Sequence, residues 1–305
     1  MSYRSVKKKL DSDHIVILDG GNGGELEKIG ATMDKDLWCG KCSVDDPEKL
    51  LEVHEKYISA GVDVITTNTY STTPISMKEY GFESFTNKWN KKSVEIAIEA
   101  ANNSDREIAV AGSVSTSGSW DRLELNQLTS GFDEHLKILS DSGVDLIILE
   151  AMTSKNKTVE AIIECSSKIN LPIWLSISCA LNKKNEKLMH GYQENINNSK
   201  PQFYEDFDAS INTFSNLHDG PILVAHSDIN IIDDAVKIIK KNHKGVAGAY
   251  PNNGYFEKPN WKLVNNISPS EYQIKAKSWT SSGAQIIGGC CGVGPDLIKS
   301  ISNLK

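Results

Sequence analysis

The sequence predicts an α/β protein that folds as a parallel (β/α)8 barrel of the TIM type, with its functional site at the carboxyl ends of the strands. Eight short apolar, β-branched runs recur along the 305 residues, and segments of helical character separate them. The runs are continuous rather than alternating, which is typical of parallel strands buried on both faces. We expect one barrel domain over residues 1–305.

The eight candidate strands follow one another in chain order. They read IVILDG from Ile15, VDVITTNTY from Val62, IAVAGSVS from Ile108, VDLIILE from Val144, PIWLSISC from Pro172, PILVAHS from Pro221, GVAGAYPN from Gly245 and AQIIGGCC from Ala284. Eight strand–helix units favour a closed barrel over a doubly wound open sheet.

The segment after the first long connection illustrates the helical pattern. In DDPEKLLEVHEKYISAG, Asp46 can cap a helix, Pro47 suits its first position and Gly61 ends it. Gly143 and Gly283 hold the same place before later strands. Connections from helix to strand are therefore expected to be short.

Connections that leave the strands are longer and more polar. They cover residues 20–45, 71–84, 115–130 and 181–200, and we expect them to be loops. Barrel enzymes build their sites at this end. The polar residues at the strand ends are Asp19, Asn68, Ser113, Glu150, Cys179, His226, Asn252, Cys290 and Cys291. Two carboxylates suit an ammonium group, whereas two thiols and an imidazole have the softness that selects zinc.

Composition excludes several classes of protein. The net charge of -7 disfavours binding to nucleic acid, which requires a basic surface. We interpret the basic cluster Lys7–Lys9 as a solvated N-terminus. No apolar segment approaches the length of a membrane span or of an export signal. Six cysteines without regular spacing do not form a secreted disulfide framework. We expect a cytoplasmic enzyme that acts on small-molecule substrates. The sequence does not indicate an oligomeric state.

Two adjacent cysteines end the last candidate strand. Neighbours in a regular strand point to opposite faces, but glycines at positions 288, 289 and 292 permit a bend that turns both thiols inward. Cys290 and Cys291 could then bind one metal ion with a third residue and leave one position open for a substrate thiol. The alternative is that both are small apolar residues of the core.

Six segments, in order along most of the chain, resemble the motifs of the homocysteine S-methyltransferase family. They are ILDGGNGGEL (17–26), VHEKYISAGVDVITTNTY (53–70), VAGSV (110–114), HLKILSDSGVDLIILE (135–150), YPNNG (250–254) and SWTSSGAQIIGGCCGVGP (278–295). The resemblance implies a zinc-dependent, cobalamin-free barrel that methylates homocysteine to methionine. The donor would be S-methylmethionine, S-adenosylmethionine, betaine or a related cation.

The resemblance also implies roles for particular residues. Cys290 and Cys291 match two zinc ligands, while Asp19, the Gly20 backbone and Glu150 match positions that hold the amino-acid end of homocysteine. The strand-end residues Asn68, Ser113 and Asn252 complete the predicted substrate site.

His226 departs from the family pattern. It stands where the family's third cysteine ligand is expected, and histidine can complete a Cys2His zinc site. A neutral ligand leaves the metal centre more positive by one charge, which lowers the pKa of a bound thiol but makes its sulfur less nucleophilic. The alternative is a hydrogen-bonded imidazole of the core with weak or absent zinc.

Other departures and motifs leave the substrate and the function class open. Asn22, Gly24 and Ala151 replace the methionine, threonine and threonine that are common in relatives. The residues Trp38, Tyr70, Trp120, Tyr250 and Tyr255 lie near strand ends, where aromatic faces suit a cationic donor.

Two alternative functions remain open. One is a homologue that binds thiols without transferring methyl groups, and the other is a thiol oxidoreductase that uses Cys39 and Cys42 of WCGKC. Glu25 could touch substrate or pair locally.

Overall fold

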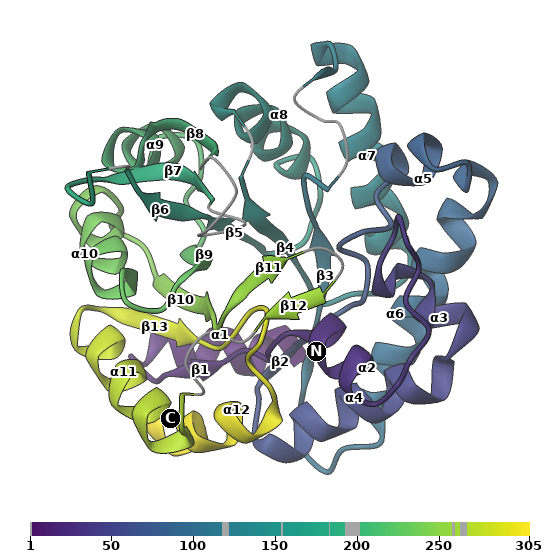
Figure 1. The fold of residues 1–305 in the computed structure, drawn as a ribbon, viewed down its shortest axis with the longest axis horizontal. Helices are drawn as coiled ribbons and strands as arrows, with labels where there is room; N and C mark the ends of the chain where they lie inside the picture. Colours follow the sequence, from purple (N-terminus) through teal and green to yellow (C-terminus); the bar gives the residue numbers. More distant parts are fainter. Residues whose placement is uncertain are drawn as a thin grey trace.

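Eight parallel strands form a ring in the computed structural model, which describes residues 2–117, 122–153, 155–182, 184–192, 202–257, 260–262 and 267–305. Their order around the ring is β1-β13-β10-β9-β5-β4-β3-β2 (Figure 1). The strands are β1 (Val16–Ile17), β2 (Val64–Thr66), β3 (Ala109–Val114), β4 (Leu146–Met152), β5 (Ile173–Ile177), β9 (Ile222–Asp228), β10 (Ala247–Asn252) and β13 (Ala284–Ile287). Each predicted run overlaps one of them, so the predicted barrel is confirmed.

Backbone hydrogen bonds between the first two strands link the ends of this sheet. Leu18 and Val64 form an isolated parallel bridge. The amide of Asp19 donates to the Val64 carbonyl at 3.1 Å, and the amide of Asp63 donates to the Ile17 carbonyl at 2.8 Å. β1 therefore has a partner on each side, as a barrel requires.

Helices surround the ring of strands (Figure 1). They are α2 (Asn22–Lys28), α3 (Cys42–Asp45), α4 (Pro47–Ala60), α5 (Pro74–Glu79), α6 (Thr86–Asn102), α7 (Leu125–Asp141), α8 (Asn156–Ser166), α9 (Phe207–Ser215), α10 (Ile232–Asn242), α11 (Pro269–Ser281) and α12 (Pro295–Ile301), with short 3-10 turns at η1 (Cys39–Lys41), η2 (Glu83–Phe85) and η4 (Ser302–Leu304).

Helix α4 begins and ends where the sequence predicts. Pro47 opens it, and Gly61 ends it with a φ of 103°, which glycine adopts at little cost. The expected side-chain cap is wrong, however. The Asp46 carboxylate instead accepts the backbone amide of Thr32 at 2.8 Å and lies 2.9 Å from the ammonium of Lys49. Asp46 therefore fastens the preceding segment onto α4.

Alternate residues of each strand pack in two separate apolar layers. The layer inside the barrel includes Leu18, Val64 and Trp174, whereas the layer between strands and helices includes Ile17 and Ile65. Burial on both faces explains why the strands read as continuous apolar runs.

The N-terminal helix α1 (Ser2–Asp11) contributes to the inner layer. Val6 and Leu10 are buried in it, and the Lys9 ammonium lies 2.5 Å from the carboxylate of buried Asp63. The expectation of a solvated N-terminus is therefore wrong for this face of the helix, although Lys7 remains exposed beside Asp11. Because Lys9 pairs with Asp63 just before β2, and the Leu10 carbonyl accepts the Gln285 side chain at the start of β13, α1 lies at the amino-terminal end of the barrel.

The connections that leave the strands contain more structure than the sequence predicts. Residues 20–45 include α2, η1 and α3, residues 71–84 include α5, and α7 begins within residues 115–130. β6 (Cys179–Leu181), β7 (Leu188–Tyr192) and β8 (Gln202–Asp206) form an antiparallel sheet after β5, while β11 (Tyr255–Glu257) and β12 (Asn260–Lys262) form a hairpin after β10. Elements this short carry too few periods for a hydrophobic pattern to show.

Among the helices within the described residues, none combines the length and the apolar character that crossing a membrane requires.

Candidate metal and substrate site

The loops that follow β1 and β13 interlock at the carboxyl end of the barrel. The amide of Gly289 donates to the Asp19 carbonyl at 2.9 Å, and the amide of Gly21 donates to the Val293 carbonyl at 3.1 Å. A side chain at position 20 would lie 2.1 Å from the Val293 carbonyl oxygen. Glycine is therefore required for this close backbone approach, which brings Asp19 beside the cysteine pair.

The two adjacent cysteines lie on a tight bend. Their Sγ atoms are 3.9 Å apart, and Gly292 directly after them has a φ of 76°. Position 289 must also be glycine, because a Cβ there would lie 2.1 Å from Val293. The predicted bend is present, although it uses left-handed backbone only at Gly292 among the three expected glycines.

His226 completes a cluster of three candidate ligands. The ligand atoms of His226, Cys290 and Cys291 all lie within 4.8 Å of one another. His226 has a φ of 47° and lies where the register between β9 and β10 shifts. Left-handed backbone costs a residue with a Cβ about 1–2 kcal/mol, so surrounding contacts must hold this conformation.

The geometry of the cluster fits a zinc ion. Two Zn–S bonds of about 2.3 Å at a tetrahedral angle place the sulfurs about 3.8 Å apart, close to the 3.9 Å between Cys290 and Cys291. The side-chain oxygen Oδ1 of nearby Asn252 is buried and has no hydrogen-bond partner among the described residues. The residues present therefore fit a metal centre with two thiols and an imidazole.

The surroundings of Cys290 disfavour its thiolate form. The hydrogen bond with Cys291, followed by burial, raises the pKa of the Cys290 thiol well above its usual value, and the neighbouring His226 opposes this effect. A bound metal ion reverses such a shift, because its positive charge stabilises the thiolate.

Asp19 belongs to the loop that follows β1, next to the loop of the cysteine pair. Its carboxylate is 1% exposed and accepts the backbone amide of Thr66 at 2.7 Å and the Thr66 hydroxyl at 3.0 Å. Burial raises the pKa of Asp19 to about 8, and the charge of Glu150 adds to the rise against the two Thr66 hydrogen bonds. Asp19 is thus a buried acid whose ionisation a nearby ammonium group would favour.

Glu150 lies where β4 bulges. The register between β4 and β5 shifts across this position, and the next residue, Ala151, has a φ of 49°. The Ser113 hydroxyl donates a short hydrogen bond to the Glu150 carboxylate. Burial raises the pKa of Glu150, while the Ser113 hydrogen bond and His226 lower it. Bulges of this kind aim side chains into sites at strand ends.

The site therefore combines two thiols and an imidazole with the buried carboxylate of Asp19 and the half-buried carboxylate of Glu150 at one end of the barrel. A family model described as homocysteine S-methyltransferase matches residues 16–304. The chain belongs to the homocysteine S-methyltransferase family. The predicted resemblance and the prediction of an enzyme are confirmed.

Individual relatives cover nearly the whole chain. Homocysteine S-methyltransferase 3 of Zea mays is 27% identical over 344 residues, which cover 98% of this chain and 92% of the relative. Selenocysteine methyltransferase of Astragalus bisulcatus is 26% identical over 327 residues, which cover 93% and 90%. Among solved structures, the homocysteine methyltransferase MmuM of Escherichia coli in its metallated form superposes with a TM-score of 0.76 at 22% identity and full coverage of both chains.

Asn68, which the sequence predicts in the substrate site, contacts Cys39 in this member of the homocysteine S-methyltransferase family. Its Oδ1 accepts the Cys39 thiol at 3.2 Å, and its Nδ2 donates to the Cys39 carbonyl at 2.8 Å. The amide thus fastens the loop that carries Trp38 and Cys39 onto the end of β2.

Cys39 and Cys42 are free, buried thiols. Burial raises the pKa of Cys39 far above its usual range and that of Cys42 to about 11. Reactive cysteine pairs have the opposite property, a lowered pKa with solvent access. The environment therefore disfavours the oxidoreductase alternative.

Asn22 is one of the residues that depart from the family pattern. Its Nδ2 donates to the Thr66 carbonyl at 3.0 Å, whereas its buried Oδ1 has no partner among the described residues. Gly24 leaves open space, since the nearest atom to a Cβ added there would be the Gly292 amide nitrogen at 3.9 Å.

The aromatic residues predicted to hold a cationic donor lie in different environments in the structure. The ring of Trp38 packs over Gly23, where an added Cβ would lie 2.4 Å away. Tyr250 is buried inside the barrel, and its hydroxyl donates to Ser176 at 2.5 Å. Tyr70 follows the carboxyl end of β2, and burial raises its pKa, with the charges of Glu150 and the cysteine pair adding to the rise. Trp120 and the side chain of Tyr255 lie outside the described residues.

Sequence reasoning missed Tyr192 and Thr66. The Tyr192 ring, on β7, meets His226 edge-on with centroids 6.0 Å apart. Nothing near Tyr192 in the sequence indicates this contact, because the antiparallel sheet that positions it was expected to be a loop. Thr66 reads as an ordinary β-branched strand residue.

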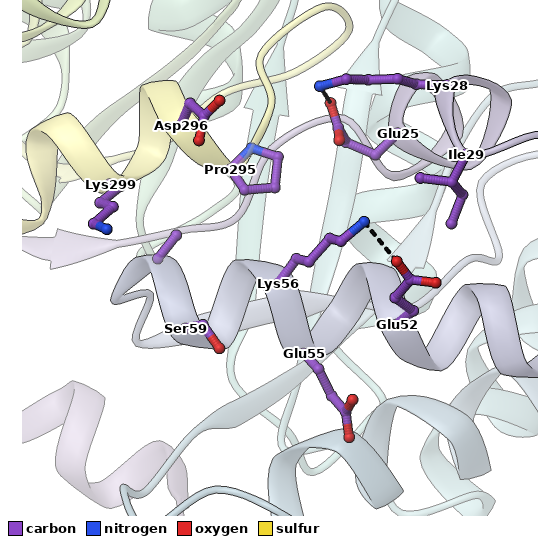
Figure 2. A pocket seen from close by; sticks show the side chains of 11 residues that line it. Glu25, Lys28, Ile29, Glu52, Glu55, Lys56, Ser59, Pro295, Asp296 and Lys299 are labelled. Carbon is purple, nitrogen blue, oxygen red and sulfur yellow. Dashed lines mark hydrogen bonds and ion pairs between the residues drawn. The ribbon is translucent and has the colours of Figure 1, made fainter.

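A separate groove of 490 Å³ lies on the flank of the barrel, lined from α2, α4 and α12 (Figure 2). Two ion pairs lie in it: Lys56 is 2.6 Å from Glu52, and Lys28 is 3.5 Å from Glu25. Glu25 thus pairs locally with Lys28, and its carboxylate lies against Gly294 in the loop that follows β13.

Proposed function

We propose that this protein transfers a methyl group from a sulfonium or quaternary ammonium donor to the thiol of homocysteine, giving methionine, within a single barrel domain over residues 1–305. The observation that carries the proposal is the cluster of His226, Cys290 and Cys291 within 4.8 Å, together with the carboxyl groups of buried Asp19 and half-buried Glu150 at the same end of the barrel. Six free cysteines suit a reducing compartment, so we place the reaction in the cytoplasm.

Zinc is the metal that this donor set favours. Thiolate and imidazole ligands in a tetrahedral arrangement are typical of catalytic zinc sites with three protein ligands. Held by these three residues, zinc would supply a Lewis acid that takes the substrate sulfur as a thiolate at neutral pH.

The carboxyl groups orient the amino-acid end of the substrate. An ammonium group between Asp19 and Glu150 would shift both acids toward their ionised forms, with the Gly20 backbone beside it. Ser113 holds Glu150, and Thr66 holds Asp19. Fixing both ends of a short substrate leaves its sulfur in one place, which converts an encounter between two molecules into a positioned attack.

The chemical step is a displacement at carbon. The sulfur of homocysteine, after losing its proton to solvent, forms a bond to the donor methyl carbon. The bond from that carbon to the donor sulfur or nitrogen breaks, and its electron pair leaves with the neutral donor product. A cationic donor suits aromatic faces, and Tyr70, Tyr192 and Trp38 are candidates for this role.

The acceptor can be a thiol or a selenol within this proposal. One relative that spans most of the chain is a selenocysteine methyltransferase, whereas others are homocysteine S-methyltransferases. Asn22 and Gly24 alter the wall next to Asp19 and are the residues to exchange first in a test of acceptor choice.

A homologue that binds the substrate without transferring a methyl group remains the second candidate. His226 favours it, because a neutral ligand makes the bound sulfur less nucleophilic than a third thiolate ligand would. The two functions share the site and differ only in turnover.

The test is a metal analysis followed by a donor screen. Protein purified with zinc should carry about one zinc per chain, and homocysteine should yield methionine with at least one of S-methylmethionine, S-adenosylmethionine and betaine. Homocysteine binding without methionine from any donor would replace the proposal by the second candidate. Absence of both zinc and homocysteine binding would overturn both.

A further inference from the structure

His226 raises a question that three cysteine ligands would not. A cysteine ligand needs no further partner, but a histidine that binds a metal through one ring nitrogen carries a proton on the other. That N–H requires an acceptor, and the acceptor fixes the tautomer and the direction of the ring. The role of such an acceptor rests on the proposed function, because it requires the metal site.

The side chain of Asn252 reaches the His226 ring. This residue ends β10, and its Nδ2 lies 3.4 Å from Nδ1 of His226. Its Oδ1 is buried without a partner among the described residues. The two ends of an amide have nearly the same shape, so a half-turn of the side chain exchanges them and brings Oδ1 to Nδ1.

The backbone around Asn252 is fixed to the cysteine pair. The Cys290 amide donates to the Pro251 carbonyl at 2.8 Å, and the Asn253 amide donates to the Cys291 carbonyl at 2.9 Å. A contact from Asn252 therefore aligns the His226 ring with both thiols. It also gives a physical reason for the unusual φ of 47° at His226, since the backbone must turn the ring toward this partner.

We propose that Asn252 is a positioning residue for His226. Its Oδ1 accepts the Nδ1–H of the imidazole and leaves Nε2 as the metal ligand. Asn252 thereby acts through His226 rather than on the substrate, although the sequence places it among the substrate-binding residues.

A double-mutant cycle on zinc affinity tests this role. Zinc dissociation constants of the wild type, Asn252→Ala, His226→Cys and the double variant are measured by competition with a chelator. Loss of an outer partner of a metal-bound histidine lowers affinity about 10–100-fold. We expect that loss for Asn252→Ala in the wild-type background and a change below about threefold in the His226→Cys background, because cysteine has no N–H to satisfy.

Three controls separate positioning from general damage. Asn252→Asp keeps an acceptor and should retain affinity within about threefold of the wild type. Asn230→Ala, an exposed position in the turn after the same strand as His226, should change nothing. Thermal unfolding of the metal-free proteins checks that each variant folds.

Two results would overturn the proposal. Unchanged zinc affinity in Asn252→Ala means that His226 needs no help from this amide. An equal loss in the wild-type and His226→Cys backgrounds means that Asn252 acts on the metal directly. Either result leaves methyl transfer by the wild type intact, whereas failure of the proposed function appears as a wild type without zinc or without turnover.

Discussion

The two halves of the site differ in how their side chains are held. On the β1–β4 side, each acid already has a donor: Thr66 for Asp19 and Ser113 for Glu150. On the β9, β10 and β13 side, the backbone is tied together, but the thiols contact each other and the Asn252 amide oxygen has no partner among the described residues.

This difference indicates which chemical group each half of the site would bind. The acids are prearranged, with pKa values raised by burial, so they gain most from a positive group such as an ammonium. The thiol half offers two sulfur atoms and an imidazole, the soft donors that zinc prefers. The following predictions break one half at a time, from the largest expected effect to the smallest.

The first prediction removes a metal ligand. Cys290→Ala should lose zinc and lower methyl transfer by more than about 100-fold, because losing a ligand exceeds the effect of losing an outer partner. Zinc content by mass spectrometry and the rate of methionine formation measure the two effects. Cys165→Ala, which changes another buried thiol, is the matched control. Full activity of a zinc-free Cys290→Ala protein would refute the proposal that methyl transfer needs a metal ion bound by Cys290.

The second prediction removes a charge from the other half. Glu150→Gln should raise KM for homocysteine about 10–100-fold, since a hydrogen bond to a charged group contributes about 1.5–3 kcal/mol. An analogue of homocysteine that lacks the amino group should lose much less. Zinc content should remain that of the wild type. Exposed Glu160→Gln serves as the control, and an equal loss for both substrates would contradict the ammonium role.

The third prediction concerns stability against pH. Folding raises the pKa of Asp19 from 3.8 to about 8, so the folded protein binds more protons and the free energy of unfolding falls as pH rises through that window. Asp19→Asn removes this penalty.

We therefore expect the melting temperature of Asp19→Asn to exceed that of the wild type by about 2 °C or more at pH 8.5, with a smaller gap at pH 5. Calorimetry of the metal-free proteins at both pH values measures it. A gap that narrows as pH rises would show that Asp19 is not an acid with a raised pKa.

The smallest effect is expected at the other cysteine pair. Replacing Cys39 and Cys42 together with serine should leave methyl transfer within about threefold of the wild type, because neither thiol has the lowered pKa of a reactive pair. Steady-state rates with and without a thiol reductant measure this. Complete loss of activity in a folded double variant would revive the oxidoreductase alternative.

The sequence predicts the parts of this molecule that leave a local pattern. Strands such as β3 and β4 are continuous apolar runs, and the glycines beside Cys290 and Cys291 indicate the bend. Contacts between distant segments leave no such pattern. The Tyr192 ring beside His226 depends on an antiparallel sheet of short strands, and the Asn252–His226 contact depends on a left-handed backbone at a histidine.

Asn68 illustrates the limit most directly. Its position at a strand end predicts a substrate contact, and the structure adds a contact that the sequence does not predict: Cys39 bonds to both ends of the amide. Placement at the carboxyl end of a strand therefore identifies candidate residues, whereas contacts from distant loops are seen only in the fold.

The central claim is that His226, Cys290 and Cys291 hold a zinc ion whose open position takes the substrate sulfur. X-ray absorption spectroscopy at the zinc edge counts the sulfur neighbours of the metal directly. The account predicts two sulfur neighbours in the free protein and three after homocysteine is added. A count that stays at two with homocysteine bound would contradict it.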